Sequence, residues 1–340
     1  MTPGNEKVKA VRCIARLLLL GIACLGLTYA CLVLWAITRL VSSHTPIDLS
    51  VLKQDPWDAG YLIFPAMIGG ALLLEMSVNG WSRSPLRRVL LEDRPSDRTD
   101  LFYLAINITG LSRILVVLMS CGLVVQFERA MDFGDTRMAS DLPLWAAVPL
   151  VYFLADLVGY WGHRLQHTAW FWPFHAVHHA AEDMTVLSSF RHHPIDKLAG
   201  EICSMLPLGL LRFSPDAIMI GMTILGMQVV LTHSTLPFPA WLEGIFSGPR
   251  AHAIHHGIDE GCFNTNFGSV TLYDRLFGTY HMRDVSDLKT GLADPFYLSG
   301  RPVTEMFAVI SRVFSNARAT LNFEQTARGT ASMWIRRNHD

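Results

Sequence analysis

Long runs of apolar residues alternate with polar loops over the first half of the chain. Four runs, near residues 14–38, 60–79, 101–126 and 142–162, approach or exceed the roughly 20 mostly apolar residues that a bilayer-spanning helix needs. The fourth run reads LPLWAAVPLVYFLADLVGYWG and leads directly into a dense group of histidines. The pattern predicts an all-α, polytopic membrane bundle of about four transmembrane helices.

A second apolar block covers residues 200–235 and is interrupted by the polar stretch RFSPDA. Its two arms, near 200–212 and 215–233, predict a hairpin that dips into the membrane. A pair of full spans is the alternative, although the first arm is short for a span.

The first apolar run has a rival interpretation as a cleaved signal peptide. Lys7, Lys9 and Arg12 precede it, and TYA resembles a cleavage site. Its apolar core is longer than the usual 7–15 residues of a signal peptide, so we favour a retained helix.

The loops between the runs predict an orientation. The N-terminal segment and loop 80–100 are rich in lysine and arginine, whereas loops 39–59 and 127–141 carry only two such residues each. Positive charge marks the cytoplasmic side of a membrane protein. We therefore expect the N-terminus and the histidines after the fourth run on the cytoplasmic side, in a helical cap.

Composition supports a membrane protein and excludes several other classes. The chain is 51% hydrophobic and 17% charged, whereas soluble chains average about 25% charged residues. A net charge of −1 gives no electrostatic basis for nucleic-acid binding. The six cysteines form no C-x-x-C pair, so neither a disulfide framework nor a thiolate zinc site is expected.

Histidine is the unusual residue type. The chain has 14 histidines, and twelve of them fall between His163 and His281. Eight stand in three motifs, HRLQH, HAVHH and HAIHH: His163, His167, His175, His178, His179, His252, His255 and His256. Others stand nearby in FRHHP and LTHST: His192, His193 and His233.

The spacing of the three motifs predicts a site for two metal ions. Residues i and i+4 share a helix face, so His163 and His167 can reach one ion. Adjacent His178 and His179 diverge by about 100° on a helix, so one motif can serve two neighbouring ions. Asp156, two turns before His163, is expected to accept a ring N–H.

The ligand type narrows the metal. Imidazole binds zinc, copper, iron and nickel, and a structural zinc site is closed at four ligands. Eight or more histidines exceed that number and favour two ions with open positions, which suits hydrolysis or oxygen activation. An all-imidazole set at the membrane edge favours iron and dioxygen.

The three motifs and their surroundings resemble the histidine boxes of the fatty acid hydroxylase / sterol desaturase superfamily. The segments HHAAEDMTVLSSFRHHPID and NTNFGSVTLYDRLFGTY resemble the family's segments after its second and third boxes. The resemblance covers about 145–281. Thr235 and Tyr273 stand where relatives often carry Asn and Trp, which weakens any assignment to a subfamily.

The resemblance implies a non-haem di-iron oxidoreductase that uses O₂ to hydroxylate or desaturate a lipid. It implies electrons from an external donor of the ferredoxin or cytochrome type. It places the metal ligands at the eight box histidines together with His193 and His233, and supporting roles at Asp156, Asn266 and Asp274. Sterol, fatty acyl, ether lipid, carotenoid and sphingoid substrates all stay open.

These patterns divide the chain into three expected parts. Residues 1–141 hold the first three transmembrane helices, 142–285 form the hydroxylase/desaturase-like catalytic domain, and 286–340 form a cytosolic tail with an amphipathic helix near 303–320. A zinc-dependent membrane hydrolase and a non-catalytic membrane zinc protein are the alternative functions. The hydrolase is disfavoured because no H-E-x-x-H motif is present.

Overall fold

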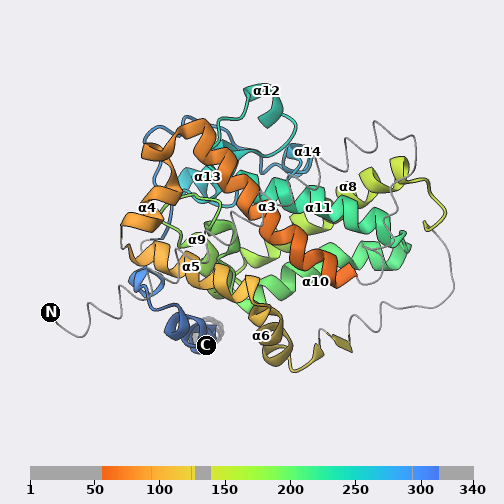
Figure 1. Ribbon diagram of the computed structural model, residues 1–340, viewed down its shortest axis with the longest axis horizontal. Helices are drawn as coiled ribbons and strands as arrows, with labels where there is room; N and C mark the ends of the chain where they lie inside the picture. Colours follow the sequence, from red (N-terminus) through yellow and green to blue (C-terminus); the bar gives the residue numbers. More distant parts are fainter. Residues whose placement is uncertain (1–55, 93, 124, 127–138, 293, 314–340) are drawn as a thin grey trace, which may run out of the picture.

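The protein is built from helices throughout the part that the structure describes (Figure 1). The computed structural model describes residues 56–92, 94–123, 125–126, 139–292 and 294–313. β-Structure within these residues is limited to isolated bridges between Phe246 and Val270 and between Gly257 and Thr290. The predicted all-α class is therefore confirmed for the described residues.

The helices and their bounds are as follows. The longer ones are α3 (Pro56–Asn79), α5 (Pro95–Ile108), α8 (Leu144–Gln166), α10 (Pro194–Leu211) and α11 (Pro215–Thr232). The shorter ones are α4 (Pro85–Leu91), α6 (Leu111–Met119), α9 (Trp172–His179), α12 (Ala240–Glu243), α13 (Pro249–His255) and α14 (Thr271–Leu276). Short 3₁₀ helices are η1 (Trp81–Arg83), η2 (Ser188–Phe190), η3 (Glu260–Cys262) and η4 (Pro295–Leu298). Residues 302–313 are also helical.

Local sequence explains why the apolar block breaks where it does. Arg212 adopts a left-handed conformation, with φ of 55°, and ends α10. Ser214 then caps α11 by accepting a hydrogen bond from the Ala217 N–H, and Pro215 occupies the first helical position. The polar stretch RFSPDA is therefore the turn of a helical hairpin.

The described helices only partly match the predicted spans. Helices α8 and α11 are long and apolar enough to cross a membrane, and α5 with α6 would form a third span as a pair bent by 87°. The predicted 142–162 span is thus an unbroken helix, but the 101–126 run is a sharply bent pair. The 60–79 run lies in α3, of which Met67–Asn79 counts as a shorter apolar helix. The 14–38 run lies outside the described residues.

The predicted hairpin and the predicted C-terminal tail both differ in part from the structure. The second arm of the predicted hairpin, α11, has the length and composition of a full span, whereas α10 is not among the candidate spans. The expected tail beginning at 286 packs in its first part against the protein, since Tyr297, Met306 and Val309 join a buried cluster with Phe174. The boundaries of the three parts stay predictions.

A bundle of three helices forms the framework of the molecule. α10 and α11 both pack along α8 (Figure 1), around a core that includes Val151, Tyr160 and Leu208. Close approach depends on glycine: a Cβ added at Gly221 of α11 would stand 2.6 Å from Val151 Cγ1, and one at Gly162 of α8 would stand 2.8 Å from Cys203. The histidine-bearing α9 and α13 lie beyond one end of this bundle (Figure 1).

We expect Gly221→Ala to lower the free energy of unfolding by about 1–3 kcal/mol, because the added methyl group overpacks the α8–α11 contact. Gly70→Ala in α3 is the matched control, since nothing lies within 4 Å of an added Cβ there. That change should be neutral or stabilise by about 0.5–1 kcal/mol, the helix preference of alanine. Denaturant titration in detergent checks both; equal effects would contradict the close packing.

Candidate metal centre

The structure brings nine histidines from four helices and their ends into two groups. The first group, which we call site A, contains His163, His167, His175, His179 and His255; the second, site B, contains His178, His233, His252 and His256. Within each group, one nitrogen from every ring lies within 4.8 Å of all the others. Nine of the ten ligands predicted from the sequence therefore come together.

Helical spacing explains how the motifs divide between the sites. His175 and His179 stand at i and i+4 on α9 and both point into site A, whereas His178 points into site B. In the HAIHH motif the assignment is reversed: His252 and His256, at i and i+4, belong to site B, and His255 of α13 belongs to site A. The pairs at i and i+4 stay together, and the pairs at i and i+3 separate. The second and third boxes therefore each serve both sites, whereas His163 and His167 of the first box both join site A.

Site A has the free nitrogens that a metal requires. Among the described residues, the Nε2 atoms of all five site A histidines are buried and have no hydrogen-bond partner. Five unpartnered acceptors in one place would be costly without a ligand. A cation that accepts these five lone pairs satisfies them, so the residues fit a bound metal.

Three site A rings are held on their far side by acceptors. His163 Nδ1–H donates to the Phe267 carbonyl at 2.9 Å, and His255 Nδ1–H donates to the Thr265 carbonyl at 2.6 Å. His175 Nδ1–H donates to Asp196 Oδ1 at 2.9 Å. Each bond fixes the tautomer that leaves the Nε2 lone pair free, an arrangement common behind metal-bound histidines.

The Thr265 and Phe267 carbonyls belong to a loop that the side chains of Asp274 and Asn266 hold in place. Asp274 accepts hydrogen bonds from the Phe267 and Gly268 N–H groups. Asn266, itself in a left-handed conformation with φ of 52°, donates to the Ala251 and His281 carbonyls. These contacts fix the carbonyls of residues 265 and 267 that orient the metal-facing rings.

Asp156 differs from its prediction. It was expected to accept a ring N–H from the histidine cluster, but its two oxygens accept the backbone N–H groups of Ser269 and Val270 at 2.9 and 2.8 Å. It therefore holds the far end of the same loop rather than a histidine. The supporting roles of Asp156, Asn266 and Asp274 stay proposals, acting through the loop.

In site B, the ring nitrogens lie close to one another. His233 Nδ1–H donates to the Val229 carbonyl at 2.9 Å, so its Nε2 carries a lone pair. That Nε2 lies 3.3 Å from His178 Nε2 and 3.0 Å from His252 Nε2. Two nitrogens bound at 2.0–2.1 Å to one ion are separated by about 3.0–3.4 Å, so site B has the spacing of a ligand set.

Burial keeps the histidines in the form that binds metal. Desolvation, reinforced by neighbouring rings, lowers the pKa of the box histidines outside the helical spans well below the ordinary histidine range: His178, His179, His252, His255 and His256. A neutral imidazole offers a lone pair, whereas a protonated one does not.

His193 lies outside both sites. Its Nε2–H donates to the Met306 carbonyl at 3.0 Å, and its Nδ1 accepts from the Ile195 N–H at the start of α10. Both ring nitrogens are engaged, so the position argues against the predicted ligand role. Its neighbour His192 stacks on His178, with ring centroids 4.3 Å apart.

Asp196 is the main site residue that sequence reasoning missed. One of its oxygens accepts from His175 and the other from His192, and Gln166 Nε2 also donates to it at 2.7 Å. Burial alone would raise the pKa of Asp196, but His175 and the hydrogen bonds outweigh burial and hold the pKa below its usual range. The available signal was a carboxylate two residues after proline in the segment FRHHPID.

A cavity of about 450 Å³ leads from the bundle to both sites. Faces of α8, α10 and α11 line it, with side chains such as Ala155, Met205 and Leu225. Its histidine end is formed by His163 and His175 of site A and by His178, His233 and His252 of site B. The volume falls in the 300–1,000 Å³ range of small-molecule sites.

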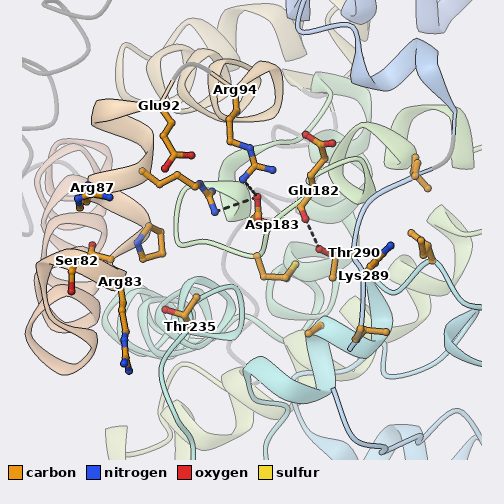
Figure 2. Close-up of a pocket in the computed structure, with 18 residues that line it drawn as sticks. Ser82, Arg83, Arg87, Glu92, Arg94, Glu182, Asp183, Thr235, Lys289 and Thr290 are labelled. Atoms are coloured by element: carbon orange, nitrogen blue, oxygen red, sulfur yellow. Dashed lines mark hydrogen bonds and ion pairs between the residues drawn. The ribbon is translucent and has the colours of Figure 1, made fainter. Parts of the chain in front are cut away.

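A second hollow, of about 820 Å³, lies between α4, the chain after α9 and residues 288–292 (Figure 2). Ala253 of α13 lines it, and the same helix carries His252 of site B and His255 of site A. Arg88 and Arg94 both pair with Asp183, at 3.2 and 2.5 Å. Five cationic and three acidic side chains line the hollow: Arg83, Arg87, Arg88, Arg94 and Lys289, with Glu92, Glu182 and Asp183.

Comparison with known proteins identifies the class. Residues 148–279, about two fifths of the chain, match the fatty acid hydroxylase family, and the relatives described below are lipid-acting enzymes of similar sequence. This confirms the resemblance carried by the three boxes. No solved structure matches the chain.

Three curated relatives show the range of the similarity. An ornithine lipid hydroxylase from Rhizobium tropici is 35% identical over 45% of this chain and 47% of its own length. An alkylglycerol monooxygenase from Danio rerio is 24% identical over 62% and 45%. A very-long-chain aldehyde decarbonylase from Oryza sativa subsp. indica is 29% identical over 48% and 64%. The chain thus spans about half to two thirds of the length of these relatives.

The structure makes a testable distinction between two buried histidines. We expect His233→Ala to lower the metal content from two ions per chain to about one, because it removes a site B nitrogen. His193→Asn should keep two ions, since asparagine can still accept the N–H at the start of α10. Elemental analysis of protein that elutes as a single folded species measures both; the reverse pattern would contradict the assignment.

Proposed function

We propose that the protein is an integral-membrane oxidoreductase that hydroxylates or desaturates a C–H bond of a lipid. Sites A and B would each hold one non-haem iron ion, and O₂ would be the co-substrate. The observation that carries this proposal is the cavity, because its apolar walls end at histidines of both sites. The names of the relatives, which include a lipid hydroxylase and a monooxygenase, support the same chemistry.

When bound, iron supplies the capacity to activate dioxygen for oxidation of an unactivated C–H bond. The protein's own contribution is positioning. The cavity would align an aliphatic carbon with the histidine end, while the loop 264–270 and Asp196 hold the ligand rings in fixed orientations. The walls exclude bulk water from that end, which protects a reactive centre from side reactions.

The alternative of a zinc hydrolase fits the site less well. Zinc metalloproteases of the H-E-x-x-H type use a carboxylate as general base beside the bound water. The carboxylates lining the cavity are already engaged: Asp156 by backbone N–H groups, Asp196 by histidines and Gln166, and Glu201 by Arg113 and Lys197. These engagements favour oxidation over hydrolysis.

The orientation in the membrane is part of the proposal. The positive charge of the N-terminal segment and of loop 80–100 supports a cytoplasmic position for the histidine sites, where a soluble reductant would be available. A ferredoxin- or cytochrome-type protein would deliver the electrons. The hollow of Figure 2 offers such a donor an approach, because α13, which lines the hollow through Ala253, carries histidines of both sites.

Charge favours an acidic donor at this hollow. Its five cationic and three acidic side chains leave a net charge of +2. The Asp183 carboxylate is neutralised by Arg88 and Arg94, and Arg83 and Arg87 extend the positive charge along one rim (Figure 2). Complementary charge steers encounter and mainly raises the association rate.

The oxidation itself is tested with isotopically labelled dioxygen. We expect iron-loaded protein, given reductant and a membrane lipid extract, to yield lipid with one labelled oxygen atom or one new double bond, read by mass spectrometry. His178→Ala removes a site B ligand and should reduce the product below detection while membrane insertion is retained. Full activity in that variant, or activity with zinc alone, would contradict the proposal.

Donor docking is tested by charge reversal. We expect the double variant Arg83→Glu/Arg87→Glu to raise the KM for an acidic ferredoxin about tenfold, because a steering charge is lost. Turnover driven by a small chemical reductant should not change. Arg301→Glu, an exposed cation outside the hollow, is the control. An unchanged KM in the double variant, or an equal rise in the control, would place the donor elsewhere.

A further inference from the structure

Two kinds of glycine occur in the three bundle helices. Gly162 and Gly221 allow close helix contact, since an added Cβ would meet side-chain atoms at 2.8 and 2.6 Å. Gly159, Gly200 and Gly226 do not: the nearest atoms to an added Cβ lie at 3.9, 3.9 and 3.6 Å, which is ordinary contact or open space. Packing therefore explains the first two and leaves the other three unexplained.

The three unexplained glycines share one property. Gly159 of α8, Gly200 of α10 and Gly226 of α11 all line the cavity that leads to the histidines. Glycine inside a helix weakens it relative to alanine. Each helix of the bundle has one such glycine on its cavity face, where a larger side chain would project into the cavity.

The positions of the glycines follow the length of the cavity. Gly159 lies four residues before His163, and Gly200 lies four residues after Asp196, about 6 Å along each helix axis. Gly226 lies seven residues before His233, about 10 Å along α11. The cavity faces of α10 and α11 then reach Met205 and Met222, about 14 and 16 Å from the same end.

We infer that these three glycines keep open a channel for one unbranched alkyl chain, and that they limit the length of chain the enzyme accepts. The inference rests on the proposed function and names its substrate class. A cavity of about 450 Å³ that follows three helices for about 14–16 Å suits a single flexible chain better than a rigid, fused ring system. Met205 and Met222 would close the far end, since methionine adapts its shape to a chain terminus.

The cavity also has one polar edge, on α10. Lys197 Nζ donates to Asn107 Oδ1 at 2.6 Å and to Ser112 Oγ at 3.2 Å. Glu201, one turn further along α10, has a 39% exposed side chain and lies 3.7 Å from Arg113. This edge suits the polar part of an amphiphile, whose alkyl chain then lies against α8 and α11.

The test measures binding rather than turnover. Purified protein with both metals would be titrated with a series of unbranched alcohols from hexanol to octadecanol, each displacing a fluorescent fatty acid. We expect Gly159→Leu, Gly200→Leu and Gly226→Leu each to weaken octadecanol binding at least tenfold. The longest alcohol that still binds well should be longer for Gly226→Leu than for the other two, because Gly226 lies further from the histidine end.

Controls separate this effect from general damage. Gly70→Leu in α3 is exposed with nothing within 4 Å, and it should change octadecanol affinity less than twofold. Should a leucine variant not fold, Gly159→Ala/Gly226→Ala gives a milder form of the same change, for which we expect at least a threefold loss. Unchanged octadecanol binding in folded, metal-loaded cavity variants would overturn the inference, as would a sterol displacing the probe as tightly as octadecanol.

The outcome also separates the inference from the proposed function. Length-dependent binding without oxidation under any reductant would leave the channel standing and remove the oxidase. Oxidation in which the three leucine variants keep the chain-length preference of the original protein would remove the channel and leave the oxidase.

Discussion

The convergence of buried ring nitrogens is the interaction on which the histidine end of this protein depends. Nine imidazoles lie together with little access to water, and most of their inward nitrogens have no partner among the described residues. Leaving one buried acceptor unpaired costs about 1–3 kcal/mol. Metal coordination satisfies many such atoms at once, because each ion takes one lone pair from several rings. The short helices α9 and α13, of eight and seven residues, could not persist alone at that length. The helical conformation of α9 and α13 therefore depends on metal coordination by their histidines and on packing against the rest of the protein.

That framework has two layers of control over the ligands. The Phe267 and Thr265 carbonyls and Asp196 hold ring N–H groups directly. Asp274, Asn266 and Asp156 hold the loop that presents the carbonyls. A carboxylate can therefore orient a histidine without contacting it. It accepts hydrogen bonds from backbone N–H groups of the loop whose carbonyl groups bond the ring. The cost of burying Asp156 and Asp274 is offset by these N–H donors.

The cavity and the charged hollow, which we propose for lipid and for the electron donor, are lined by different parts of the protein. The cavity approaches along α8, α10 and α11, which contain the candidate spans, and ends at rings of both sites. The charged hollow approaches α13 from another face, beside α4 and the chain after α9 (Figure 2). Two separate approaches would let a membrane-bound substrate and a soluble donor reach one centre together. The glycines on the cavity faces of three helices would then set which part of a chain arrives there.

The sequence by itself determined the class of protein and most of the histidines that converge in the two groups. Apolar runs of span length and three histidine boxes are local patterns, and local patterns follow from helix geometry alone. It identified nine of the residues that the structure brings together, and His233 was found without a box. Tertiary structure decided the rest. The division of the second and third boxes between two sites depends on how α8, α9, α11 and α13 cross. The roles of His193, Asp156 and Asp196 depend on partners 30 to 114 residues away, and no spacing along a chain encodes such a contact. Which glycines pack and which line a cavity is likewise set by the neighbouring helix.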